Sequence, residues 1–194
     1  MSQTPKTTRE RALSEAKELL QERGFHGFSF QHVAERIGIK KPSLYDHFKS
    51  KEDLGRELIE DYRRSFARWT ETLSFLEPKE KIEGFFELFF AFVSNSGKFC
   101  PMSALIADGN SLPPKMRKPL GQMFDFQLAW LKAVVEEGQK KKTFRRDFTS
   151  DQLAGFVISL GMGSQLVSRV TENPDHLRKM KGQMLAILLT EAAA

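Results

Sequence analysis

The sequence predicts an all-α protein with an N-terminal helix-turn-helix domain of three helices and a C-terminal helical domain. Along most of the 194 residues, apolar side chains recur every three or four positions, which is typical of amphipathic helices. Capping residues, glycines and prolines divide this pattern into segments. One stretch, residues 29–54, combines two short helical segments with a glycine between them.

The pattern predicts nine helices, and we place the domain boundary after the third. We expect residues 1–50 to form the first domain and residues 51–194 to form the second. The predicted helices span about residues 8–23, 29–37, 42–48, 51–75, 79–94, 101–107, 114–137, 150–170 and 175–192.

The first helix begins after Thr7, which forms a capping box with Glu10. An apolar stripe from Ala12 to Leu20 follows, and Gly24 ends the helix. We expect this helix to support the two short helices that come after it.

The next two helices are short and are joined by a tight turn. Ser29 caps the first of them, which carries Phe30 and Ile37 on its apolar face. Gly38 accepts the left-handed backbone that a sharp turn requires. Pro42 suits the first turn of the second helix, because its missing N–H needs no partner there. These features predict helix-turn-helix geometry.

The second short helix presents polar groups outward. Leu44 and Phe48 are four residues apart and pack this helix onto the first. From Arg36 to Lys51 the sequence has five basic residues and one acid, Asp46, and this excess suits a polyanion such as DNA. The outward side chains are those of Lys41, Pro42, Ser43, Tyr45 and His47.

Over about its first 55 residues the chain resembles the DNA-binding domain of the TetR family of bacterial transcriptional regulators. The shared pattern is Val-Ala…Gly-Ile…Pro-Ser-Leu-Tyr-Asp-His-Phe-Lys-Ser-Lys-Glu-Asp-Leu. The resemblance implies that Lys41 and Pro42 approach base edges in the major groove. It also implies that Ser43, Tyr45 and His47 hold the DNA backbone.

The resemblance further implies contacts with the flanking phosphates, by Lys51 at the start of the next helix and by Ser29 at a helix end. The chain departs from the family at Lys40, where many members have a capping Ser or Thr. The start of the second short helix is therefore less well capped, and Lys40 is itself a candidate for a phosphate contact.

A long helix of residues 51–75 connects the two domains. Ser50 and Asp53 repeat the capping pattern, and apolar residues from Leu54 to Leu73 follow at spacings of three or four. At about 1.5 Å per residue this helix is about 35 Å long, and we expect it to act as a single lever. The next helix, residues 79–94, is apolar on nearly all sides and therefore needs neighbours that enclose it.

The last two helices each carry a stripe that suits a helix–helix contact. Thr149 and Gln152 cap the first of them, and Asn173 and Pro174 separate it from the second. Two interpretations stay open: the stripes face the chain's own core, or, as the resemblance implies, they form a four-helix bundle between two subunits. The stripe residues are Gly155, Ser159, Gly163, Met180, Met184, Ile187 and Leu188.

The resemblance also implies a central cavity in the C-terminal domain, mostly apolar with a few polar groups. Aromatic residues at helical spacing more often simply pack in a core, and this interpretation stays open for each of them. The candidate ligand contacts are Tyr62, Phe66, Trp69, Phe89, Phe99, Met102, Met123, Gln127 and Trp130.

Cys100, the single cysteine, directly precedes Pro101 at a predicted helix start and lies two residues from Lys98. The helix dipole and the nearby ammonium favour the thiolate and raise its reactivity. One interpretation is a sensor of electrophiles or oxidants, as some TetR-type regulators have in the same region. The other is a small buried apolar residue.

The composition permits DNA binding and indicates a reducing compartment. The formal net charge is +5, and residues 1–50 carry nine basic and six acidic side chains, hence three of these charges. The single cysteine excludes a disulfide within the chain. Neither an export signal nor an apolar run that spans a bilayer is evident. We therefore expect a cytoplasmic protein.

An enzymatic function is not expected. His26, His32, His47 and His176 lack metal-ligand spacing, and the sequence has neither a glycine-rich phosphate loop nor a nucleophile motif. We therefore expect no metal and no other cofactor.

Together these predictions describe a repressor that binds a palindromic operator as a homodimer and that a small apolar or electrophilic effector releases. Such an effector acts only through a difference in its affinity for two states. The alternative is an all-helical module that binds a small molecule or lipid and has no DNA role. It would use the same apolar body but would not need a basic recognition helix.

Overall fold

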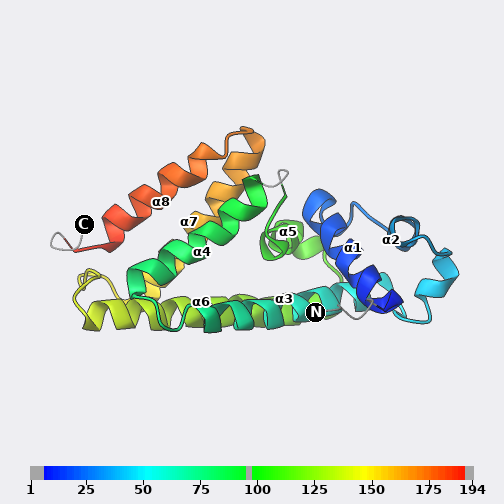
Figure 1. Cartoon of the computed structure of the whole chain (residues 1–194), viewed down its shortest axis with the longest axis horizontal. Coiled ribbons are helices and arrows are strands. Elements are labelled where there is room, and N and C mark those ends of the chain that lie inside the picture. The colour runs from blue at the N-terminus through cyan, green and yellow to red at the C-terminus, as the bar shows by residue number, and fades with distance from the viewer. Residues whose placement is uncertain (1–6, 95–97, 191–194) are drawn as a thin grey trace, which may run out of the picture. The chain divides into compact units, whose positions relative to one another are not determined.

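A computed structural model describes residues 7–94 and 98–190 of the chain (Figure 1). In these ranges it has eight α-helices and two short 3₁₀ helices, and no strand apart from one bridge between Phe144 and Leu189. The predicted all-α fold is confirmed. The α-helices are α1 (Thr8–Arg23), α2 (Phe30–Ile37), α3 (Lys51–Thr72), α4 (Pro78–Ser94), α5 (Pro101–Asp108), α6 (Pro114–Lys140), α7 (Ser150–Val170) and α8 (Asp175–Leu188), and the 3₁₀ helices are η1 (Lys41–Leu44) and η2 (Gly109–Ser111).

The chain divides into two compact units that do not follow its order in sequence. The N-terminal unit contains residues 1–66 and 101–123, and the C-terminal unit contains residues 67–100 and 124–194. Helices α3 and α6 therefore each contribute residues to both units. The functional boundary expected after residue 50 is a different division and stays a prediction.

Helix α1 begins at the predicted capping box. Thr7 Oγ1 accepts a hydrogen bond from the Glu10 N–H at 3.2 Å, and the Glu10 carboxylate accepts one from the Thr7 N–H at 2.8 Å. Thr149 and Gln152 form an equivalent box at the start of α7. Gly24 ends α1 with a φ of +74°, a left-handed value that favours glycine.

The loop after α1 is bonded to the end of α5, although 83 residues separate the two groups. The Asp108 carboxylate accepts a hydrogen bond from the Phe25 N–H at 2.7 Å, and Ser111 Oγ lies 3.1 Å from His26 Nε2. This junction holds the segment from which the chain enters α2.

Helix α3 packs closely in the N-terminal unit because residue 55 is a glycine. A Cβ built at Gly55 would lie 2.6 Å from Met116 Cε and 2.7 Å from the Phe25 ring. Leu54 and Leu58 of the same helix are buried. The missing side chain thus lets α3 approach α6 and the loop after α1.

Helices α4, α7 and α8 pack together in the C-terminal unit, and Figure 1 shows α7 and α8 side by side. The ring of Phe85 in α4 lies 5.2 Å from that of Phe89 and 6.0 Å from that of Trp130, between centroids. Gly161 of α7 makes room for Phe89, since a Cβ there would come within 2.5 Å of that ring. An aromatic core therefore holds α4 against α6 and α7.

An ion pair between Lys81 and Glu137, with an N–O distance of 2.7 Å, links α4 to α6. The hydrogen bond from Lys81 is the main reason why the pKa of Glu137 lies below its usual value, and burial of the carboxylate acts in the opposite direction. Because this pKa is lowered, the stabilisation is present at neutral pH and is lost as the pH falls through the lowered value.

The predicted ends of three helices are wrong. We expected the helix that begins at residue 51 to reach residue 75, but α3 ends at Thr72. We expected Gly138 to stop α6, but the helix continues to Lys140, and Gly138 instead makes room for the Phe144 ring. We expected the last helix to reach residue 192, but α8 ends at Leu188, whose carbonyl accepts the Arg145 N–H at 3.0 Å. Residues 191 and 192 of that prediction lie outside the described residues.

Among the described helices, α7 is long and apolar enough to cross a membrane by length and composition. Core helices of soluble proteins meet the same criteria, and α7 packs against α4 and α8.

We expect Gly55→Ala to lower the free energy of unfolding by about 1–3 kcal/mol, because the added methyl group displaces Met116 and the Phe25 ring. The matched control is Gly121→Ala in α6, where a Cβ meets no atom of the described residues within 4 Å. There we expect a gain of about 0.5–1 kcal/mol from helix propensity. Chemical unfolding measures both variants, and equal effects at the two positions would contradict the close packing at Gly55.

Candidate functional site

The recognition segment, defined here as residues 38–48, begins with the predicted left-handed turn. Gly38 has φ of +72° and ψ of +36°, and the Ile39 N–H donates a hydrogen bond to the Ala34 carbonyl at 3.0 Å. At the start of α2, the Ser29 N–H donates to His32 Nδ1 at 3.1 Å. Helix α2 is thus held at both ends, and the chain turns sharply after it.

The second short helix is not the α-helix that we predicted but the 3₁₀ helix η1. The Ser43 N–H donates to the Lys40 carbonyl at 3.0 Å, and the Tyr45 N–H donates to the Pro42 carbonyl at 3.1 Å. These bonds span three residues, whereas α-helical bonds span four. Lys40 provides no side-chain cap and Pro42 has no N–H, so the start of an α-helix is poorly stabilised here.

Two apolar side chains of the recognition segment are buried, and most of the others face solvent. Leu44 and Phe48 are 0% and 2% exposed. Tyr45 is 52% exposed, and its ring centroid lies 5.2 Å from that of Phe30 in α2. The exposed side chains are those of Lys40, Lys41, Pro42, Tyr45 and the acidic Asp46, and the half-buried ones are those of Ile39, Ser43 and His47. The segment therefore offers ammonium and hydroxyl groups to a ligand.

Lys51 lies against an aromatic pair. Its Nζ is 4.4 Å from the ring centroid of Phe25 and 4.6 Å from that of Phe28, which is cation–π geometry. Burial lowers the pKa of Lys51, and the charge of Asp108 acts in the opposite direction. The implied phosphate contact of Lys51 stays a prediction.

Some of the basic side chains in the N-terminal unit are neutralised by ion pairs. Arg36 pairs with Glu22 at 2.5 Å and with Glu15 at 3.6 Å. The hydrogen bond with Glu22 is the main reason why the pKa of Arg36 is raised. Arg9 pairs with Glu57. Of the basic residues from 36 to 51, the exposed lysines Lys40, Lys41 and Lys49 therefore offer positive charge to a polyanion.

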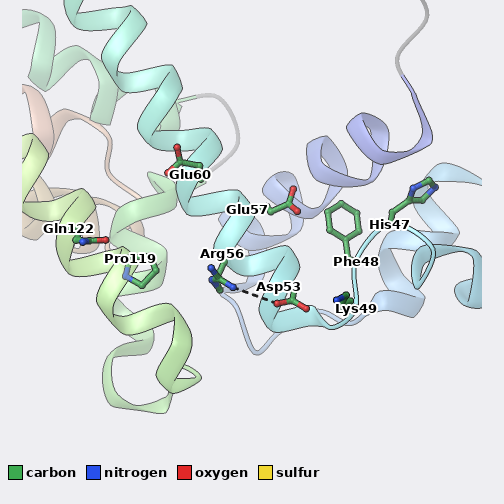
Figure 2. A pocket seen from close by; sticks show the side chains of 9 residues that line it. All are labelled: His47, Phe48, Lys49, Asp53, Arg56, Glu57, Glu60, Pro119 and Gln122. Atoms are coloured by element: carbon green, nitrogen blue, oxygen red, sulfur yellow. Dashed lines mark ion pairs between the residues drawn. The ribbon is translucent and has the colours of Figure 1, made fainter.

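A cleft of about 580 Å³ lies beside the recognition segment in the N-terminal unit (Figure 2). Asp53, Glu57 and Glu60 of α3 line it at helical spacing, a signal that is present in the sequence but that we did not use. Each of these carboxylates is paired with an arginine: Asp53 with Arg56, Glu57 with Arg9 and Glu60 with Arg63. Among the residues described, no three His, Cys, Asp or Glu side chains are grouped as metal ligands. The lining residues are His47, Phe48, Lys49, Asp53, Arg56, Glu57, Glu60, Pro119 and Gln122.

The candidate ligand contacts lie mostly in the core, and their role stays a prediction. Trp69 and Trp130 lie together, with ring centroids 5.5 Å apart. Phe99 lies under the guanidinium of Arg169, 4.2 Å from it. The buried members of the set are Tyr62, Phe66, Phe89, Met102, Met123 and Gln127, and the half-buried members are Trp69, Phe99 and Trp130.

A cavity of about 420 Å³ lies in the C-terminal unit, at the end of α7, and none of its wall residues is among the ligand contacts predicted from the sequence. Ser168 and Arg169 occupy ordinary positions of α7, and Glu172 lies in the turn that follows it, so no pattern distinguishes them in the sequence. The cavity is lined by Val93, Ser168, Arg169, Glu172 and Pro174.

Cys100 is buried, with 2% of its surface exposed, and directly precedes α5. Its N–H donates a hydrogen bond to Gln165 Oε1 at 3.2 Å. Burial favours the interpretation as an apolar residue, because a reagent reaches the thiol only after the surrounding side chains move. The sensor interpretation stays a prediction.

The predicted dimer residues fall into two groups. Met184 and Leu188 are 0% exposed and pack in the core of their own chain, because the apolar side of α8 faces α4 and α7. These two positions are therefore corrected to core residues. A Cβ at Gly155 or Gly163 would meet no described atom within 4 Å, and Ile187 is 42% exposed. The open group comprises Gly155, Ser159, Gly163, Met180 and Ile187.

Comparisons with known proteins match both parts of the chain. Residues 12–58 match the family described as "Bacterial regulatory proteins, tetR family", and residues 78–184 match "Tetracyclin repressor-like, C-terminal domain". Over 181 residues the chain is 25% identical to the HTH-type transcriptional repressor DhaR of Mycobacterium sp. (strain GP1). This match covers 91% of the chain and 89% of that repressor.

Two solved structures share the fold. A TetR-family transcriptional regulator from Agrobacterium tumefaciens matches with a TM-score of 0.89 and 22% identity, over 94% of this chain and 97% of that one. A TetR transcriptional regulator from Legionella pneumophila matches with a TM-score of 0.87 and 30% identity, over 96% of this chain and 100% of that one.

Proposed function

Because the chain belongs to the TetR family of bacterial transcriptional regulators, we propose that it is a repressor that binds a palindromic operator as a homodimer and is released by a small effector. The observation that carries this proposal is the recognition segment, in which two buried apolar residues support exposed lysine and tyrosine side chains. A cytoplasmic, non-catalytic role accords with the regulators that the chain resembles.

The recognition segment suits the major groove because its outer side is short, polar and basic. In this proposal Lys41 and Pro42 approach base edges, while Ser43, Tyr45 and His47 hold the DNA backbone. The sharp turn at Gly38 supports the proposal, since it directs η1 away from α2. The proposed phosphate contacts are Ser29, Lys40 and Lys51.

We propose that two copies of the chain pair through the open face of α7 and α8. The small residues on this face allow a second helix to approach closely. Leu166, Val167 and Val170 of α7 are also 42%, 43% and 85% exposed, and a partner would remove this apolar surface from water. The two recognition segments of such a dimer would read two half-sites of one operator.

We propose that a small apolar or electrophilic effector acts on the C-terminal unit and changes the affinity for the operator. Helix α3 supports this route, because it runs from the N-terminal unit into the C-terminal unit without a break. A movement of the part of α3 in the C-terminal unit is therefore transmitted to the part in the N-terminal unit. The effector must bind the operator-competent state less tightly than the released state.

Lys41→Ala and Tyr45→Ala should each weaken binding to an operator selected from a random DNA pool by about 1–3 kcal/mol, because each removes a DNA contact. Lys40→Ala, at a proposed phosphate contact, should reduce the slope of log affinity against log salt by about 1. Lys140→Ala, an exposed lysine of the C-terminal unit, is the control. Gel-shift titrations with unchanged affinity for both variants would reject these contacts, and a pool that yields no twofold-symmetric site would reject the operator itself.

Gly163→Arg should yield monomers in light scattering, because a long charged side chain blocks the approach of a second α7 while the chain itself leaves room for it. Gly121→Arg, at an equally open glycine in α6, should leave the assembly unchanged. If the Gly163 variant stays dimeric, the interface lies elsewhere.

If Cys100 is a sensor, treatment of the protein without substitutions with N-ethylmaleimide should reduce its affinity for the operator roughly 5- to 150-fold. This is the usual range of coupling between two sites. Cys100→Ser should bind the operator normally and lose this response. Mass spectrometry confirms the adduct. An adduct on Cys100 that leaves operator affinity unchanged would assign the residue to the core alone.

A further inference from the structure

A second basic surface of the N-terminal unit lies between α3 and the beginning of α6. It is a groove of about 540 Å³, and Arg56 of α3 and four residues of α6 line it. The residues of α6 are Pro114, Lys115, Lys118 and Pro119. The described residues of this wall thus include three cationic side chains and no carboxylate. We call this surface the basic groove.

The positive charge of the basic groove is largely available to a ligand. Lys115 and Lys118 are exposed, and neither ammonium forms an ion pair within residues 7–94 and 98–190. The Glu52 carboxylate accepts the main-chain N–H of Lys115 at 3.2 Å, which leaves the ammonium unused. Arg56 lies 3.8 Å from Asp53, and its side chain is 51% exposed, so this pair is weak.

The two lysines are not placed there for the stability of α6. Both lie among the first five residues of the helix, and its first turn has no acidic side chain. The beginning of a helix carries a partial positive charge, so cations near it destabilise the helix. The bound phosphates of a polyanion would offset this cost.

The basic groove adjoins the recognition segment. It shares Arg56 and Pro119 with the cleft in Figure 2, whose lining also includes His47 and Lys49. Arg56 follows Lys51 by five residues, which is about 8 Å along α3. Phosphates recur about every 3.4 Å along each strand of duplex DNA, so this distance corresponds to about two base pairs. A duplex held by the recognition segment therefore extends toward the basic groove.

We propose that the basic groove binds the phosphate backbone of the operator, outside the base pairs that the recognition segment reads, through Arg56, Lys115 and Lys118. The inference rests on the proposed function and extends the DNA-binding surface to α6, beyond the match of residues 12–58. These contacts contribute affinity but no sequence preference, because every base pair carries the same phosphates.

The double variant Lys115→Ala, Lys118→Ala tests the groove in anisotropy titrations of the selected operator at several salt concentrations. The slope of log affinity against log salt should fall by about 2, or about 0.9 for each lost contact. At 0.1 M salt the affinity should fall roughly 10- to 60-fold, and that for an unrelated duplex should fall by a similar factor. An unchanged slope would overturn the proposal.

Single variants provide a matched control for the loss of charge. Lys118→Ala should lower the slope by about 1, whereas Lys140→Ala, which removes an exposed lysine of the C-terminal unit, should leave it unchanged. Equal effects at the two positions would show that only the net charge of the chain matters, and would overturn the groove.

Ethylation interference locates the contact on the operator, since an ethylated phosphate has lost its charge. With the protein without substitutions, ethylation outside the base pairs that are read should weaken binding at phosphates that no longer matter for the double variant. Lys140→Ala should keep the original pattern. Identical patterns for the double variant and the protein without substitutions would contradict the proposal.

Thermal unfolding separates a DNA contact from a structural role. The melting temperature of the double variant without DNA should rise by about 1–4 °C, because two cations are removed from the beginning of a helix. A fall in melting temperature would assign the lysines to the stability of the fold and would overturn the proposal.

The two proposals fail separately. If the chain selects a symmetric operator and the double variant binds it like Lys140→Ala, the groove is wrong and the repressor function stands. If the chain selects no operator but the double variant still lowers the salt slope for unrelated duplexes, the groove stands and the repressor function is wrong.

Discussion

The carboxylate of Asp108 stabilises two points of the chain that lie on either side of the recognition segment. It accepts the Phe25 N–H at the point where the chain leaves α1, and its charge favours the ammonium of Lys51, which rests on the Phe25 and Phe28 rings. Both the entry to α2 and the start of α3 therefore depend on one side chain at the end of α5. Helix α2 and η1 lie between these two points in the sequence, and they are also held by the packing of α2 against α1 and of η1 against α2.

Helix α5 therefore connects a residue that is bonded to α7 with the residue that is bonded to the loop after α1. Its first residue follows Cys100, whose N–H is bonded to Gln165 of α7, and its last residue is Asp108. Eight residues of α-helix span only about 12 Å. A side chain that moves near Gln165 and a loop that supports the recognition segment are thus connected by a short, stiff element, which suits a regulator that couples ligand binding to DNA binding.

Local signals account for what could be predicted from the sequence. Three predicted features depend only on residues that are close in sequence, and all three are present. They are the capping boxes at Thr7 and Thr149 and the turn at Gly38. The bond from Phe25 to Asp108 joins residues 83 positions apart, and no local pattern reveals it. Met184 and Leu188 fit an interface stripe in sequence, but which side of α8 faces the core depends on α4 and α7. The spacing of apolar residues over 42–48 predicts an α-helix, but η1 is a 3₁₀ helix, and Lys40 provides no side-chain cap at its start.

Because α3 and α6 each belong to both compact units, the DNA-reading head is not a detachable module. A chimera that transplants residues 1–50 alone into another regulator would leave behind Asp108 and also Met116, which fills the space beside Gly55. The graft would have to include residues 51–66 and 101–123 as well. Under the proposed function, changing single side chains of the recognition segment is therefore a simpler way to change the operator specificity than exchanging residues 1–50.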